Sequence, residues 1–161
     1  MSERTTRVVL VPGVLALLPE YAGIEDPVAE LRAAALGAVG WLGREVTVLA
    51  DAQGARVAAH LLDSTERDGD KPSYLVVGNG SAKRTEKAPG HYDERAEPFD
   101  AALGEALKAG RPDVDRELAR ELWASVEALT ELPPAASGAT VRVDYDDAPY
   151  GVQYWVMRWE G

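Results

Sequence analysis

Cysteine is absent from this chain of 161 residues, and histidine occurs only twice, at His60 and His91. Without cysteine the chain has no disulfide, no thiolate nucleophile and no zinc–thiolate site. A chain without disulfides fits a cytoplasmic protein, which is the location we expect. Any catalytic or metal centre must therefore be built from carboxylates, hydroxyls, lysine, arginine and the two imidazoles.

An excess of positive charge is also missing. The chain has 17 Lys and Arg residues against 27 Asp and Glu residues, which gives a formal net charge of −10. A surface of this sign repels phosphate backbones, so nucleic acid is not an expected partner. The hydrophobic share of 46% and the length are typical of one globular domain with its own core, here residues 1–161.

Long hydrophobic runs are lacking too, and a bilayer needs about 20 consecutive apolar residues. The longest candidate, residues 8–18, follows Arg4 and Arg7 and in this respect resembles a signal peptide. Pro12 and Gly13 interrupt the run, and no convincing small-residue cleavage site follows it. We therefore expect a buried first strand that leads into a loop, and no contact with a membrane.

Strand-like and helix-like segments alternate along the chain. Apolar runs predict strands at residues 8–11, 46–50, 74–77, 141–145 and 152–159. Helical spacing predicts helices at residues 28–42, 54–62, 98–107 and from Asp113 or Asp115 to Leu129, the first preceded by Asp26 and Pro27 as its N-terminal signals. This order predicts an α/β fold, specifically a three-layer α/β/α sandwich with a mixed, mostly parallel sheet. Turn chemistry at residues 148–151 predicts a C-terminal antiparallel hairpin.

The last predicted strand has two apolar faces. Tyr154 and Val156 share one face, and Trp155, Met157 and Trp159 share the other. Such a strand is either buried on both sides within the chain or uses one side in a homo-oligomer. Both interpretations remain open at this stage.

The loop that begins at Gly78 is the most informative segment. Polar loops of this length in compact domains are usually functional or disordered, and binding residues concentrate on loops. The glycines either make tight turns or form a nest of backbone amides for a small anionic ligand, since basic side chains lie close by. The expected ligand-binding residues lie near the ends of the first and third strands: Gly13, Gly78, Asn79, Gly80, Ser81, Arg84 and Lys87.

Candidate catalytic residues lie on the same loop. His91, Asp93 and Lys83 could serve acid–base chemistry on a small aromatic or anionic substrate. Ser81 has no G-x-S-x-G context and is not expected to be a nucleophile. His60, which lies within a helical pattern, is expected at a helix surface or core edge. The aspartates around Tyr145 either cap a turn or, with Asp146, bind a cation.

Two segments together resemble the class III extradiol dioxygenase-like family, in its small uncharacterised bacterial branch. One is residues 78–100, with GNGSAKR, EKAPG and DERAEPFD, and the other is residues 145–152, YDDAPYGV. The resemblance covers most of residues 70–161, and the N-terminal half is shorter than in typical relatives. It implies an α/β fold and, for the ring-cleaving enzymes, Fe(II) held by two histidines and a carboxylate.

The resemblance also implies that the first iron ligand follows the first strand in a Pro-His-Pro context. This chain has Pro12 and Gly13 there, and only His60, His91 and Asp146 could contribute to a metal site. We therefore expect a relative that lacks the complete Fe(II) site and acts as a non-catalytic binding or interaction protein. The alternative is a metal-dependent enzyme, dioxygenase-like or hydrolase-like, that uses the loop and Fe(II) or another divalent metal.

Overall fold

The structure is a computed structural model that describes residues 5–14, 17 and 28–161. The described strands form a five-stranded mixed sheet in the order β2-β3-β1-β5-β4. The strands are β1 (Arg7–Val11), β2 (Val46–Leu49), β3 (Ser73–Val77), β4 (Thr140–Asp147) and β5 (Tyr154–Glu160). The helices are α1 (Ala29–Gly40), α2 (Ala52–Asp63), α3 (Ala96–Lys108) and α4 (Arg116–Glu121), with short 3₁₀ turns at Leu129–Glu131 and Pro134–Ala136. The predicted N-terminal signals Asp26 and Pro27 lie outside the described residues.

The N-terminal half supplies the parallel part of the sheet. β1 and β2 both pair with β3 in parallel, whereas β5 pairs with β1 in antiparallel direction. The residues from Val8 to Val11 are fully buried because β1 has a strand on each side and helices above and below. The predicted buried first strand is therefore confirmed.

The C-terminal hairpin is antiparallel, as predicted. β4 pairs with β5, and the Gly151 amide donates to the Ala148 carbonyl at 3.2 Å across the turn that joins them. β5 lies inside the sheet with β1 along one edge and β4 along the other, and the residues from Tyr154 to Met157 are at most 5% exposed. Its two apolar faces are thus explained by burial within the chain. Two of the four strand pairings are parallel and two are antiparallel.

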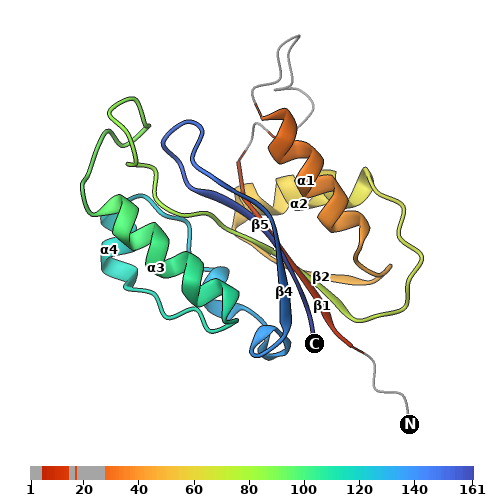
Figure 1. Cartoon of the computed structure of the whole chain (residues 1–161). Coiled ribbons are helices and arrows are strands. Elements are labelled where there is room, and N and C mark those ends of the chain that lie inside the picture. Colours follow the sequence, from red (N-terminus) through yellow and green to blue (C-terminus); the bar gives the residue numbers. More distant parts are fainter. Residues whose placement is uncertain (1–4, 15–16, 18–27) are drawn as a thin grey trace.

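Helices cover the sheet on opposite sides (Figure 1), with α1 and α2 on one side and α3 and α4 on the other. The buried apolar residues accordingly form two clusters. One contains Val9, Leu31 and Leu61, and the other contains Leu10, Leu107 and Trp159. Alternate residues of β1 face alternate clusters, as the two-residue period of a strand requires.

The predicted long helix from Asp113 or Asp115 to Leu129 is wrong. α4 has six residues, capped at its start by Asp115, and ends at Glu121. Beyond it the Ser125 amide donates to the Asn79 carbonyl and the Asn79 amide donates to Ser125, each at 3.0 Å. The apolar spacing over residues 118–129 is helical, but this pairing with the chain after β3 gives the backbone other partners. No helix among the described residues is long and apolar enough to cross a membrane.

Two glycines in left-handed backbone conformation offer a matched test of packing. Gly110 has φ +70, and an added Cβ would overlap the Ala136 carbonyl oxygen, whereas Gly138 has φ +73 and open space. Left-handed backbone costs a non-glycine residue about 1–2 kcal/mol. We expect Gly138→Ala to lose about that amount in urea denaturation and Gly110→Ala to lose clearly more, because backbone must also move. Equal losses would contradict the close approach of Gly110 to the Ala136 backbone.

Candidate functional site

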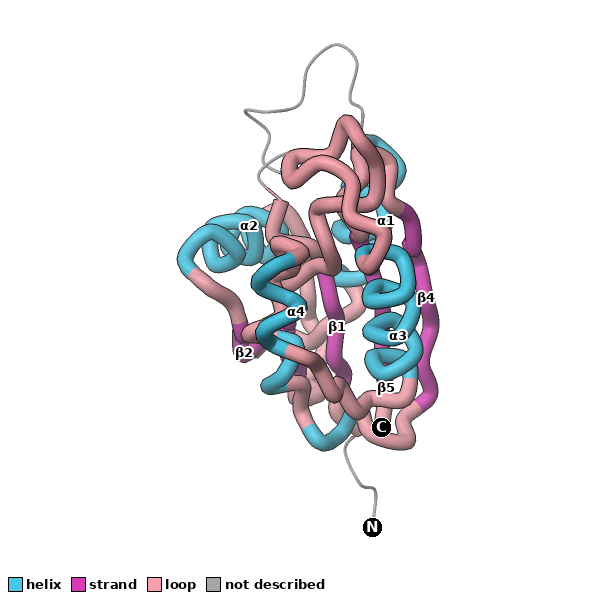
Figure 2. The backbone as a smooth tube through the Cα atoms, turned by 90° about the vertical axis from the view of Figure 1, so that its left-hand side faces the viewer, coloured by secondary structure: helices cyan, strands magenta, loops and turns pink. Residues whose placement is uncertain are grey.

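The candidate site lies at the carboxyl edge of the sheet. β1, β2 and β3 are parallel, and β4 runs in the same direction because it is antiparallel to β5. The segments that follow β1 and β3 and the turn between β4 and β5 therefore come to the same end of the molecule (Figure 1), which Figure 2 shows from another side. Ligands of open α/β sheets bind at this edge.

The loop of residues 78–95 is held to the sheet and to the hairpin by backbone hydrogen bonds. Gly78 donates to Val11, Gly80 donates to Gln153, and Arg84 donates to Gly151, at 2.9 to 3.0 Å. An added Cβ on Gly80 would lie 2.5 Å from an Asp100 oxygen and 2.8 Å from Gln153 Cβ. This glycine is therefore required by close packing.

Asp100 of α3 anchors the start of this loop. Its Oδ1 accepts from the Ser81 amide at 2.8 Å, and its Oδ2 accepts from the Ser81 hydroxyl at 2.7 Å. Arg84 Nη1 lies 3.4 Å from the same Oδ2. Asp100 is 2% exposed and Ser81 is fully buried. Burial raises the pKa of the Asp100 carboxyl above its ordinary value, although the bonds from Ser81 and the charge of Arg84 oppose this shift.

Gln153 at the end of the hairpin extends the same network. Its Oε1 accepts from Arg84 Nη1 at 2.7 Å, and its Nε2 donates to Asp146 Oδ1 at 2.8 Å and to the Tyr154 carbonyl at 3.2 Å. The structure thus brings together Ser81, Arg84 and Asp146, which the sequence suggested separately, and adds Asp100 and Gln153, which it did not. A cavity of about 290 Å³ lies beside these side chains, next to α3.

The backbone amides of the predicted nest are all engaged within the chain. Gly78 and Gly80 donate to Val11 and Gln153, Asn79 donates to Ser125, and the Ser81 amide donates to Asp100. Residues 78–81 therefore use these four amides within the chain.

The three candidate catalytic residues have separate surroundings. Asp93 pairs with Arg95 at 2.8 Å, and this hydrogen-bonded guanidinium lowers the pKa of Asp93 to about 2. Lys83 Nζ lies over the ring of Trp123, 5.3 Å from its centroid. His91 is exposed with φ 62, and its Nδ1 is 3.4 Å from the Glu86 carbonyl. Lys87 is exposed as well. The loop collects these side chains, but each has a different partner, so their contacts do not form one proton-transfer chain.

The residues available for iron do not fit the expected triad. An added Cβ at Gly13 would lie 3.1 Å from Val77 Cγ1 and 3.5 Å from the Gly54 backbone, so a ligating imidazole would need rearrangement there. His60 is half-buried on α2 beside Ser64, and Asp146 accepts from Gln153. Within residues 5–14, 17 and 28–161, no group of three or more His, Asp or Glu side chains could hold a metal ion.

Sequence reasoning missed the segment that follows α4. Trp123 has φ 60 and is 56% exposed, and it occupies the position after the helix where glycine is normally found. The Ala124 amide donates to Ala119 at 2.8 Å, which is the bond of a Schellman motif. α3 ends in the same motif with Gly110 at φ 70. No signal in the sequence marks this turn, because tryptophan stands at the left-handed position where glycine would have indicated a helix end.

Three exposed aromatic residues are each the sequence neighbour of a residue that is hydrogen-bonded to the backbone of residues 82–84. Ala82 donates to Leu122, which precedes Trp123, and Arg84 donates to Gly151, which follows Tyr150. The Lys83 carbonyl accepts from Asp93, which follows Tyr92. Tyr92 is 59% exposed and Tyr150 is 48% exposed. Lys83 lies over Trp123, and the backbone of residues 82–84 connects the three aromatic residues; we call Tyr92, Trp123, Tyr150 and Lys83 together the aromatic surface.

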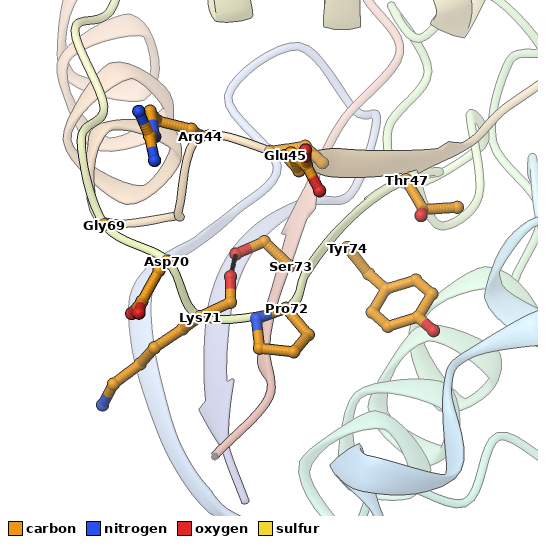
Figure 3. A pocket seen from close by; sticks show the side chains of 10 residues that line it. Arg44, Glu45, Thr47, Gly69, Asp70, Lys71, Pro72, Ser73 and Tyr74 are labelled. Atoms are coloured by element: carbon orange, nitrogen blue, oxygen red, sulfur yellow. Dashed lines mark hydrogen bonds between the residues drawn. The ribbon is translucent and has the colours of Figure 1, made fainter.

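A larger cavity, about 690 Å³, lies at the opposite end of the sheet, before β2 and β3 (Figure 3). Two of its polar side chains are engaged within the chain. Ser73 Oγ donates to the Lys71 carbonyl at 2.9 Å and accepts from the Gly43 amide at 2.8 Å. Lys71 Nζ is 3.2 Å from Glu160. We therefore do not choose it as the candidate site.

Comparison with known proteins does not assign the chain to a family. No model of a protein family matches the chain, and a search of curated proteins finds no similar sequence. The resemblance to extradiol dioxygenases accordingly stays a prediction.

The buried carboxyl of Asp100 generates a pH prediction. The pKa of Asp100 is raised in the folded state. Above its ordinary value of about 3.8, the folded chain therefore keeps a proton that the unfolded chain has released. Ionisation of this carboxyl opposes folding as pH rises. The free energy of unfolding of wild type, minus that of Asp100→Asn, should therefore fall as pH rises from about 4 through the folded pKa. Urea titrations over this range measure it. Asp144→Asn on β4 is the matched control, and a difference that rises with pH would contradict the prediction.

Proposed function

We propose that the chain is a non-catalytic binding protein on a three-layer α/β/α scaffold of the extradiol-dioxygenase type, with an incomplete iron site and a cytoplasmic location. Its contact region is the aromatic surface at the carboxyl edge of the sheet. The observation that carries this proposal is Trp123, a large apolar side chain that is exposed and held in left-handed backbone.

Trp123 is unfavourable to stability on two counts. Left-handed backbone costs a non-glycine residue about 1–2 kcal/mol, and its exposed ring gains little from burial within the chain. The Lys83 ammonium above the ring returns only about 0.5–1 kcal/mol at an exposed site. The same motif after α3 uses glycine. A residue that the fold does not require is explained by a contact with another molecule.

The composition of the aromatic surface supports the same proposal. Tryptophan and tyrosine are enriched where protein interfaces have most of their binding energy. Five large hydrophobic residues are exposed among those described, and three of them belong to this surface: Tyr92, Trp123 and Tyr150. The other two, Val48 and Val143, lie on β2 and β4 at the edges of the sheet.

Substitution of Trp123 separates a role in binding from a role in folding. We expect Trp123→Gly to raise the free energy of unfolding by at most about 1 kcal/mol, because glycine relieves the backbone strain but loses the Lys83 contact and is more flexible in the unfolded chain. Trp123→Ala keeps the strain and should not stabilise. Urea denaturation of both variants measures this. A Trp123→Gly variant less stable than wild type would show that the ring is structural.

Binding itself is tested by a photo-crosslinking amino acid placed at Tyr92, with the same amino acid at the exposed Val48 as control. We expect one defined partner to crosslink at Tyr92, not at Val48, and to be lost when Trp123→Gly is added. Equal crosslinking at both positions would contradict the proposed surface.

The alternative is an enzyme that works through the loop with a metal ion. Untagged protein purified without oxygen should contain iron far below one equivalent and should show no catechol-dependent oxygen uptake. Stoichiometric Fe(II) with such uptake would overturn the non-catalytic proposal. Turnover of any small aromatic or anionic substrate that His91→Ala and Lys83→Ala both abolish would do the same.

A further inference from the structure

A second cavity lies at the same edge of the sheet, above the ends of β2 and β3. Its volume is about 400 Å³, within the range of small-molecule sites. Val77 is the last residue of β3, and Asp51 follows β2, so the cavity sits where adjacent parallel strands end. This is the position at which α/β sheets bind their ligands.

Two arginines of α4 line this cavity from one helical face. Arg116 and Arg120 are four residues apart, and residues at this spacing are neighbours on a helix surface. Arg116 Nη2 lies 3.3 Å from Thr130 Oγ1, which orients its guanidinium. The guanidinium of Arg120 has no hydrogen bond or ion pair with any residue that the structure describes. It is therefore available to a ligand.

Two carboxylates, Asp51 and Glu127, lie beside the two arginines, so the formal charge of the lining is zero. Asp51 Oδ1 accepts from the Gly54 amide at 2.7 Å as the N-cap of α2, so its charge is already stabilised by the start of a twelve-residue helix. Glu127 is exposed at the rim. Because Asp51 is occupied at the start of α2, the guanidinium donors of Arg120 and Arg116 are left for an anion, and arginine binds carboxylates and phosphates through two parallel hydrogen bonds.

The rest of the lining is small and apolar, with Ser125 as an additional hydroxyl. Val77, Val126 and three alanines leave space for a compact apolar group next to the charged atoms: the alanines are Ala119, Ala124 and Ala128. The Ser125 backbone is fixed by its pairing with Asn79. The geometry points to a binding site for a small organic oxyanion, a carboxylate or a phosphate, held by Arg120 and Arg116. None of the loop residues suggested by the sequence lines it.

This inference adds a ligand to the edge that the proposed function uses, but a different observation carries it. The lining of the cavity does not include Trp123. Trp123→Gly should therefore leave oxyanion binding within about twofold of wild type, a change of only about 0.4 kcal/mol. The two proposals can thus fail independently.

Calorimetric titration with inorganic phosphate and with benzoate, at low ionic strength, tests the inference. We expect at least one of the two to bind with a Kd of about 1 mM or tighter, and the arm that saturates identifies the oxyanion. Arg120→Gln should weaken that binding at least about tenfold, since a charge-assisted hydrogen bond is lost. Arg142→Gln, the same charge change on the exposed strand β4, should leave it unchanged.

Two results would overturn the inference. One is the absence of saturable binding of both anions up to about 10 mM, where the binding free energy is only about −2.7 kcal/mol. The other is equal weakening by Arg120→Gln and Arg142→Gln, which would show general attraction of anions rather than a site. Thermal unfolding of both variants checks that the exposed substitutions leave the fold intact.

Discussion

The buried carboxyl of Asp100 is the constraint on which the carboxyl edge depends. It takes both donors of Ser81, which starts the loop after β3, and it lies beside Arg84, which reaches Gln153 in the hairpin. A single side chain of α3 therefore connects the loop, the helix and the last two strands. Burial of a carboxyl is unfavourable without such partners. The arrangement is stable because Ser81 and Arg84 need acceptors for their donors and the buried Asp100 carboxylate needs donors for its oxygens.

This connection explains why the residues at the start of the loop whose side chains could do chemistry instead hold the loop in place. Ser81, Arg84 and Asp146 belong to a hydrogen-bonded network whose donors and acceptors are largely used within the chain. The side chains left to contact other molecules lie further out. They are Arg120 of α4 and the residues of the aromatic surface, which stand on the loop, directly after α4 and in the β4–β5 turn. A rigid support for exposed contact residues is the usual arrangement of binding loops.

The sequence predicted the strands, three of the helices and the terminal hairpin because their apolar periods and turn residues are local properties. It could not predict the short α4, because the spacing of Leu118, Leu122 and Val126 is helical and only the pairing of Ser125 with Asn79 ends the helix. The role of Asp100 was hidden for a similar reason. An aspartate in a helix is ordinarily exposed, and its burial depends on a serine nineteen residues away. Arg120 was equally hard to identify, since two arginines four residues apart are ordinary on an exposed helix face.

The network around Asp100, the aromatic surface and the cavity lined by Arg120 also constrain one another physically. Segment 122–125 is bonded to the loop through Ala82 and Asn79, and it carries Trp123 towards the aromatic surface and Ser125 towards the oxyanion cavity. A ligand that ordered Arg120 on α4 would act on the helix whose final turn sets the left-handed backbone of Trp123. The cavity and the tryptophan ring therefore depend on the same short segment but on different side chains, so a substitution of Trp123 leaves the arginines of the cavity in place.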